Sequence, residues 1–170
     1  MQTHSGRQYW PLDPKPDDVD IFDIAHALSN LCRFGGHVSS FYSVAQHSVY
    51  VSHNVPLEWR LVALLHDATE AYVVDVPRPL KKFLTNYKEI ELLNWFAIAE
   101  RFYLPLEMPE CIHDADNFVL RAEARILMPR SEWAYADHAA DLGRTFQPLE
   151  PRAAKMFFLD RFMELTDAGH

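Results

Sequence analysis

The chain has 170 residues, a formal net charge of -8 and a hydrophobic content of 49%. That hydrophobic content is enough to build a core in a domain of this size, which excludes an intrinsically disordered protein. The acidic balance argues against a polynucleotide-binding surface, because such surfaces carry clustered basic residues.

Signals for disulfides, secretion and membrane insertion are missing from the sequence. Two cysteines, Cys32 and Cys111, are too few for a disulfide-stabilised framework. The first ten residues lack the apolar core of a secretory signal. No apolar run reaches the ~18 residues that a membrane span needs. We therefore expect a cytoplasmic protein with no membrane partner.

The pattern of apolar residues predicts an all-α fold. Only five glycines occur, and long stretches of helical periodicity are separated by prolines. After an N-terminal arm over 1–17, the expected helices are 18–32, 43–55, one that begins near 56 and carries 66–70, 85–102, 109–128, and a last one from 151.

The segments between these helices are also informative. Two prolines within 75–79 predict a rigid loop, because proline disrupts a helix interior. Residues 129–148 are polar and lead to the last helix. We expect a single domain over 1–170, in which 129–170 form a C-terminal extension that packs on the helical bundle.

Four ligand-type side chains interrupt apolar helix faces. His47 and Asp116 each share a face with apolar residues three and four positions away, and His66 and Asp67 end an apolar run. Buried carboxylates without partners are costly and repel one another. A divalent cation removes both penalties and suits mixed nitrogen and oxygen ligands. We predict one divalent cation bound by His47, His66, Asp67 and Asp116.

These residues resemble the motifs of the HD-domain superfamily of metal-dependent phosphohydrolases. The string HDATE followed by Asp75-Val76-Pro77 is similar to bacterial 5'-deoxynucleotidases. The segments IAHALSNLCRFGGH and FYSVAQHS resemble a compact subgroup that includes the dATP triphosphohydrolases of phages using 2-aminoadenine. The likeness covers residues 3–128.

The resemblance implies a compact HD-domain bundle that removes phosphate from (deoxy)nucleotides, including stepwise removal from dNTPs such as dATP. It implies that Glu70 orients or deprotonates the attacking water and that Asp75 assists with that water or the leaving oxygen. It also implies a homo-oligomer. The aromatic residues of the last helix either form the contact between subunits or close the core of the monomer: Phe157, Phe158 and Phe162.

A phosphoryl substrate needs positive charge beyond the metal. Arg33 matches the arginine that this family places ahead of its first ligand histidine, and a guanidinium there can bind phosphate through two parallel hydrogen bonds. Arg78 and Lys81 belong to the tight basic cluster of this acidic chain and are further candidate contacts. Phe34 is a candidate stacking surface for a base or sugar.

Several points stay open at the level of sequence. The ligand set accepts Co²⁺, Mn²⁺, Zn²⁺, Ni²⁺ or Mg²⁺, and the phosphate chain of the substrate is undetermined. One alternative is hydrolysis of a signalling nucleotide such as ppGpp, although the further acidic motifs of that family are not found. Another is a catalytically inactive HD module that binds nucleotides, against which the intact ligand set and Glu70 argue.

Overall fold

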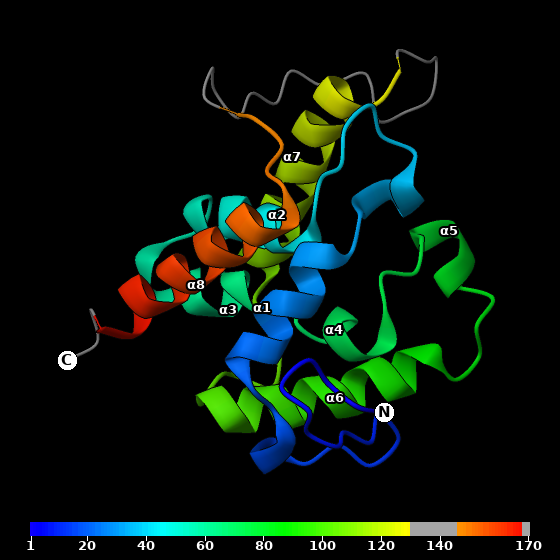
Figure 1. The fold of residues 1–170 in the computed structure, drawn as a ribbon, viewed down its shortest axis with the longest axis vertical. Coiled ribbons are helices and arrows are strands. Elements are labelled where there is room, and N and C mark those ends of the chain that lie inside the picture. The colour runs from blue at the N-terminus through cyan, green and yellow to red at the C-terminus, as the bar shows by residue number, and fades with distance from the viewer. Residues whose placement is uncertain (130–145, 168–170) are drawn as a thin grey trace.

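The structure, a computed structural model, describes residues 1–129 and 146–167 (Figure 1). Within those residues the regular secondary structure is helical and no strand forms, so the predicted all-α fold is confirmed. The helices are α1 (Ile21–Asn30), α2 (Val44–His53), α3 (Arg60–Leu64), α4 (Glu70–Val73), α5 (Arg78–Lys81), α6 (Tyr87–Phe102), α7 (Glu110–Leu127) and α8 (Pro151–Asp167).

Four helices form the centre of the bundle: α1, α2, α3 and α8 pack against one another. Helix α7 packs on α2, and α4 lies between α1 and α6 (Figure 1). In that view α6 crosses the lower part of the molecule and α7 rises in the upper part. Helix α2, which carries His47, and helix α7, which carries Asp116, therefore lie side by side.

Helix starts follow from local sequence. The carboxylate of Asp20 accepts a hydrogen bond from the backbone N–H of Phe22 at the start of α1. Ser43 caps α2 by accepting from the N–H of Gln46, as the sequence predicts. Helix α8 begins with Pro151, which is tolerated there because the first turn has no intrahelical acceptor for its nitrogen.

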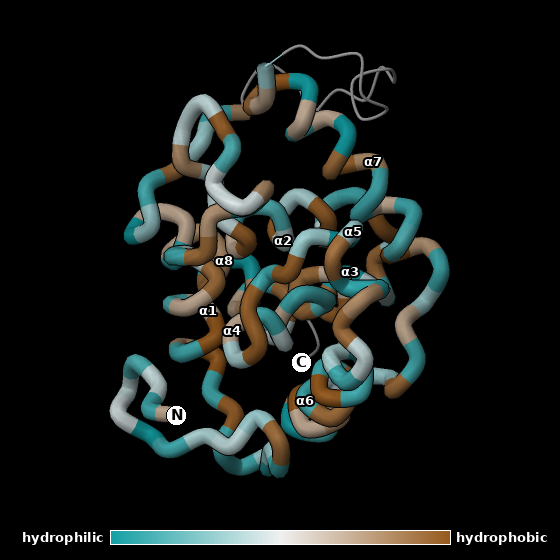
Figure 2. Tube along the Cα trace, turned by 90° about the vertical axis from the view of Figure 1, so that its right-hand side faces the viewer, coloured by the Kyte–Doolittle hydropathy of each residue, from teal (hydrophilic) through white to brown (hydrophobic). Residues whose placement is uncertain are grey.

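The main core joins residues from all of the longer helices, including Ile24, Leu28, Leu64, Ile98 and Phe158, each with no exposed surface. Figure 2 shows hydrophobic and hydrophilic residues alternating along the helices, as expected where one face of each helix is buried. In this part of the chain, no helix combines the length and apolarity that crossing a membrane requires.

The predicted helix beginning near 56 is wrong in one respect that matters for the site. It is divided into α3 and α4, and residues 65–69 between them form turns. Nδ1 of His66 lies 2.7 Å from the carbonyl oxygen of Ala63, the oxygen that a continuing helix would offer to the N–H of Asp67. The side chain of His66 therefore competes with the helix, and the His-Asp pair lies in a tight turn.

The predicted rigid loop over 75–79 is also shorter than expected. The short helix α5 begins at Arg78 and carries Pro79 in its first turn. Proline is accepted there because its missing N–H would have no intrahelical partner. Both Arg78 and Lys81 consequently belong to one helical turn.

The N-terminal arm is anchored to the bundle. Tyr9 is fully buried, its ring stacks on that of Tyr72 at 3.7 Å, and its hydroxyl donates to Asn94 Oδ1 at 2.8 Å. Aromatic stacking and a buried hydrogen bond both favour a fixed position over a mobile tail.

The C-terminal helix completes the core of the monomer. Phe158 is fully buried, while Phe157 and Phe162 are partly buried against the main core. Gln46 of α2 fixes the segment ahead of α8 through hydrogen bonds to the backbone of Gln147 and Leu149. These aromatic residues therefore serve the fold of one subunit, and the homo-oligomer stays a prediction without an assigned contact. Residues 130–145 of the expected extension lie outside the described residues.

Candidate metal centre

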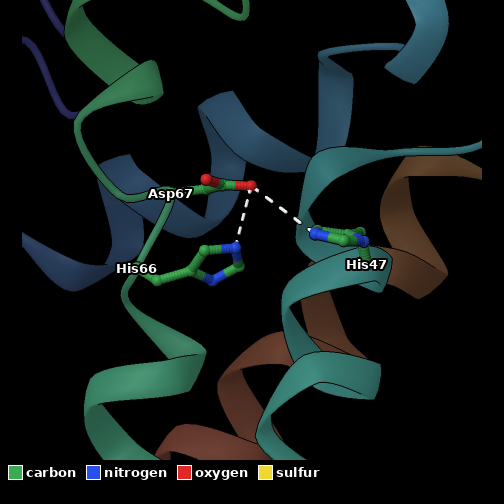
Figure 3. A group of neighbouring side chains, drawn as sticks. All are labelled: His47, His66 and Asp67. Atoms are coloured by element: carbon green, nitrogen blue, oxygen red, sulfur yellow. Dashed lines mark ion pairs between the residues drawn. The ribbon is translucent and has the colours of Figure 1, made fainter. Parts of the chain in front are cut away.

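Three of the predicted ligands meet at one point, where α2 faces the turn after α3 (Figure 3). Oδ2 of Asp67 lies 3.2 Å from Nε2 of His66 and 3.7 Å from Nε2 of His47. One ligand atom from each residue falls within 4.8 Å of the others. His47, His66 and Asp67 could therefore hold a metal ion.

The two imidazoles are oriented by hydrogen bonds on their far nitrogens. Nδ1 of His47 lies 2.8 Å from Oε1 of Glu123, and Nδ1 of His66 lies 2.7 Å from the carbonyl oxygen of Ala63. A carboxylate and a carbonyl only accept, so each Nδ1 carries the proton. In the neutral form of each ring, which is the form that can bind a metal, the lone pair of Nε2 faces Asp67.

Both Nε2 atoms are buried and make no hydrogen bond with the described residues. Unpartnered buried nitrogens are rare in native proteins and need an explanation. When both rings are neutral, their Nε2 lone pairs and the carboxylate of Asp67 repel one another unless a positive charge lies between them. A divalent cation fits these residues because it accepts all three donors.

Asp116 of α7 borders the same point. Its Oδ1 lies 3.1 Å from Nε2 of His47, while its Oδ2 accepts from the guanidinium of Arg78. Burial alone would raise the pKa of Asp116, but the neighbouring His47 holds it below its usual range. Asp116 is therefore ionised and adjacent to the three-residue group.

The charge on His47 depends on its surroundings. Burial lowers its pKa and Arg33 lowers it further, but Glu123 and Asp116 outweigh them and raise the pKa to about 9. Without a metal, a proton on His47 balances the adjacent carboxylates. A metal ion that binds there must displace this proton.

Glu70 and Asp75 lie next to the ligand group but do not join it. Burial, followed by the charges of Asp67 and Asp75, raises the pKa of Glu70 well above its usual range. Glu70 Oε2 is buried without a hydrogen-bond partner, and Oε1 lies 4.0 Å from Nζ of Lys81. Burial also raises the pKa of Asp75. Raised pKa values of this kind are common among carboxyl groups that transfer protons in enzymes.

Each predicted phosphate-binding cation already faces a carboxylate, which the sequence does not reveal. Nε of Arg33 donates to Glu123 and its NH1 lies 3.7 Å from Asp67 Oδ2. Lys81 pairs with Glu91 at 2.9 Å. The ring of Phe34 lies 5.5 Å from the guanidinium carbon of Arg33, on a backbone with a φ of 56°. A left-handed backbone is unusual for a bulky residue and marks a locally constrained loop.

A cavity of about 960 Å³ opens beside the ligand group. Every predicted site residue lines it except His47, which is fully buried behind the others. Apolar residues of α6, α7 and the chain between them also line it: Trp95, Met108, Ile112 and Leu120. The cavity thus offers both charged and apolar side chains to a ligand.

Sequence reasoning missed Glu123, which is fully buried and touches His47, Arg33 and Tyr42. A signal for it exists: Glu123 follows Asp116 by seven residues on α7, so both lie on one helix face. An acidic residue two turns after a predicted ligand is a candidate partner for that site.

Comparison with known proteins identifies relatives along nearly the whole chain. It is 41% identical over 171 residues to YfdR, an uncharacterized protein of Escherichia coli strain K12, and the alignment covers 98% of this chain and 96% of YfdR. The chain belongs to the YfdR family. A second relative, the uncharacterized protein RCAP_rcc00048 of Rhodobacter capsulatus, is 37% identical over 142 residues, which cover 75% of this chain and 72% of that protein. No family model matches the chain.

Proposed function

We propose that this member of the YfdR family is an HD-type metal-dependent phosphohydrolase that removes phosphate from (deoxy)nucleotides. The observation that carries the proposal is the pair of buried, unpartnered Nε2 atoms of His47 and His66 facing Asp67. The sequence motifs of these residues support the same conclusion, because they resemble the ligand motifs of HD-domain enzymes.

The proposed metal shell consists of His47, His66, Asp67 and Asp116. Asp116 is included because its Oδ1 lies 3.1 Å from Nε2 of His47 and its carboxylate is ionised. Two histidines and two carboxylates suit Mn²⁺, Co²⁺, Ni²⁺ or Zn²⁺, and Mg²⁺ is a further candidate. A divalent cation supplies a Lewis acid that neutralises phosphate oxygens and lowers the pKa of water.

In this proposal, Glu70 handles the proton of the attacking water. Its Oε2 is free of hydrogen bonds to the described residues, and its raised pKa makes the carboxylate a stronger base than an exposed glutamate. Asp75 lines the same cavity, and burial raises its pKa as well. Two such groups can receive a proton from water and deliver one to a leaving oxygen.

The shape of the cavity supports a nucleotide substrate. Its volume of about 960 Å³ is at the upper end of common small-molecule sites. Arg33, Arg78 and Lys81 line the cavity, and each lies beside an acidic residue of the proposed site, where phosphate oxygens would lie. The apolar lining residues, which include Trp95, offer a surface for a base.

The alternative of a catalytically inactive module is disfavoured by Glu70. A buried carboxyl group with an unpartnered oxygen and a raised pKa lowers the stability of the folded protein at neutral pH. A module that only binds a nucleotide would gain nothing from this arrangement. An enzyme uses it for proton transfer.

The experiment that tests the proposal is a panel of nucleoside mono-, di- and triphosphates incubated with metal-loaded protein. Phosphate, pyrophosphate and triphosphate are measured separately, so the bond that is cleaved is identified together with the preferred base. We expect metal-dependent release from at least one deoxynucleotide. Release from none of them, by protein that elemental analysis shows to contain metal, would contradict the enzymatic proposal.

A further inference from the structure

Three donors from separate parts of the chain converge on the side chain of Glu123. Oε1 accepts from the hydroxyl of Tyr42 at 2.6 Å and faces Nδ1 of His47 at 2.8 Å. Oε2 accepts from Nε of Arg33 at 3.1 Å. The glutamate side chain has no exposed surface, so these three groups replace the water that a carboxylate normally binds.

This arrangement is expensive for a purely structural contact. An ionised group loses its hydration on burial, and well-packed apolar residues often give the same or greater stability. The two oxygens of Glu123 face three donors, an arrangement that suits an ionised carboxylate, which only accepts hydrogen bonds. The cost of burying the Glu123 carboxylate indicates a functional role in addition to packing.

We infer that Glu123 is a positioning residue that sets His47 and Arg33 for the metal centre. It accepts the Nδ1 proton of His47 and so directs the Nε2 lone pair at the metal. Its second oxygen holds Arg33, whose NH1 lies 3.7 Å from Oδ2 of Asp67. One buried carboxylate thereby orients two of the proposed ligands, one directly and one through the guanidinium. The inference rests on the metal centre of the proposed function.

Glutamine cannot do the same work, although it has the same shape. If the glutamine oxygen faces His47, the glutamine NH₂ group faces the Nε–H donor of Arg33, and two donors cannot form a hydrogen bond. If its oxygen faces Arg33, the amide donates toward Nδ1 of His47, and the imidazole must move its proton to Nε2. A protonated Nε2 has no lone pair for a metal. Either orientation disturbs the centre.

Tyr42 provides a matched control on the same carboxylate. Tyr42→Phe removes one hydrogen bond to Glu123 but leaves its contacts with His47 and Arg33. If Glu123 only stabilises the fold, Tyr42→Phe and Glu123→Gln should both be less stable than wild type, and their metal affinities should be the same. If it positions His47, Glu123→Gln alone should weaken metal binding.

The test is a zinc titration of chelator-stripped wild type, Glu123→Gln and Tyr42→Phe at one pH, with folding checked by circular dichroism. We expect Glu123→Gln to bind Zn²⁺ 10–100-fold more weakly, the usual effect of removing an outer partner of a ligand histidine. Tyr42→Phe should bind close to wild type. Unchanged zinc affinity in folded Glu123→Gln overturns the positioning role of Glu123 but not the proposed metal centre. A wild type that binds no metal overturns the proposed centre.

A second measurement uses only the wild type, in case Glu123→Gln does not fold. Long-range ¹H–¹⁵N spectra of the zinc-loaded protein report which nitrogen of His47 carries the proton. We expect a protonated Nδ1 that exchanges slowly with water and a zinc-bound Nε2. Zinc bound at Nδ1, or a proton on Nε2, overturns the inference.

Discussion

Arg78 and Asp116 connect the two sides of the cavity. A guanidinium nitrogen of Arg78 in α5 donates to Oδ2 of Asp116 in α7, while Oδ1 of the same carboxylate lies 3.1 Å from Nε2 of His47. The Arg78 side chain is 52% exposed, so solvent screens this pair and its contribution to stability is small. Its importance lies in where it places a cation, at the rim of the proposed phosphate site.

Replacing Arg78 with alanine should therefore affect substrate binding more than folding. We expect Arg78→Ala to raise the KM for a nucleotide by roughly tenfold, equivalent to about 1.4 kcal/mol, with little change in melting temperature. Steady-state kinetics measures the effect. Lys82→Ala is the control, because Lys82 is an exposed neighbour that does not line the cavity. Equal effects of the two substitutions would show that only the general charge of this segment matters.

Asp67 is the proposed metal ligand that lies next to both ligand histidines. Asp67→Asn keeps the size of the side chain but removes its charge, and we expect the folded protein to lose its bound metal and its phosphatase activity together. Metal content is measured by elemental analysis after gel filtration. Asp114→Asn, an exposed carboxylate on α7, is the control. Full metal occupancy in Asp67→Asn would eliminate the proposed shell.

Glu70 should be separable from metal binding. We expect Glu70→Gln to bind metal and nucleotide but to lose about 10²–10⁴-fold in kcat, the usual range for one proton-transfer group. Single-turnover assays with metal-saturated protein measure this loss. A variant that hydrolyses its best nucleotide near the wild-type rate would show that Glu70 has no catalytic role.

The same substitution makes a prediction about stability. The folded-state pKa of Glu70 is raised, so ionisation destabilises the metal-free protein as pH rises above the unfolded value of about 4.3. Glu70→Gln should therefore melt at a higher temperature than wild type at pH 7–8, in the presence of EDTA. The difference should vanish as pH falls toward about 4, where the carboxyl is protonated in both states. A destabilised variant at neutral pH would contradict the raised pKa.

Metal binding should release a proton from His47. In the metal-free protein its pKa is about 9, above the unfolded value of about 6.5, so the stabilisation from protonation is complete below pH 6.5 and lost through pH 9. We expect metal affinity to increase with pH up to about 9 and about one proton to be released per metal at pH 7.5. Calorimetry in two buffers of different ionisation enthalpy counts the protons, in the Glu70→Gln background so that Glu70 contributes none. No release would contradict protonation of His47.

Much of the centre is predictable from sequence because burial of polar groups leaves a periodic signature. His47 and Asp116 occupy positions on their helices where apolar residues are expected, and the structure places them 3.1 Å apart. Helix α2, its Ser43 cap and the all-α fold follow from the same kind of local pattern.

What sequence patterns miss are contacts between side chains that are distant along the chain. His66 interrupts its own helix by binding the carbonyl of Ala63, which periodicity does not indicate. The pairing of Arg33 with Glu123 joins residues 90 positions apart. Glu123 stands among alanines and arginines in the sequence and resembles an ordinary exposed helix carboxylate, whereas in the structure three donors surround it.

The most direct test of the central claim is a metal titration of hydrolysis. Chelator-stripped wild-type protein is mixed with the best nucleotide of the panel, and phosphate release is recorded as Mn²⁺ or Co²⁺ is added. We predict no release without metal and a rate that rises to a plateau at about one bound ion per chain, as expected for a single four-ligand site. Hydrolysis that is unaffected by removing the metal, or no hydrolysis at full metal occupancy, would contradict it.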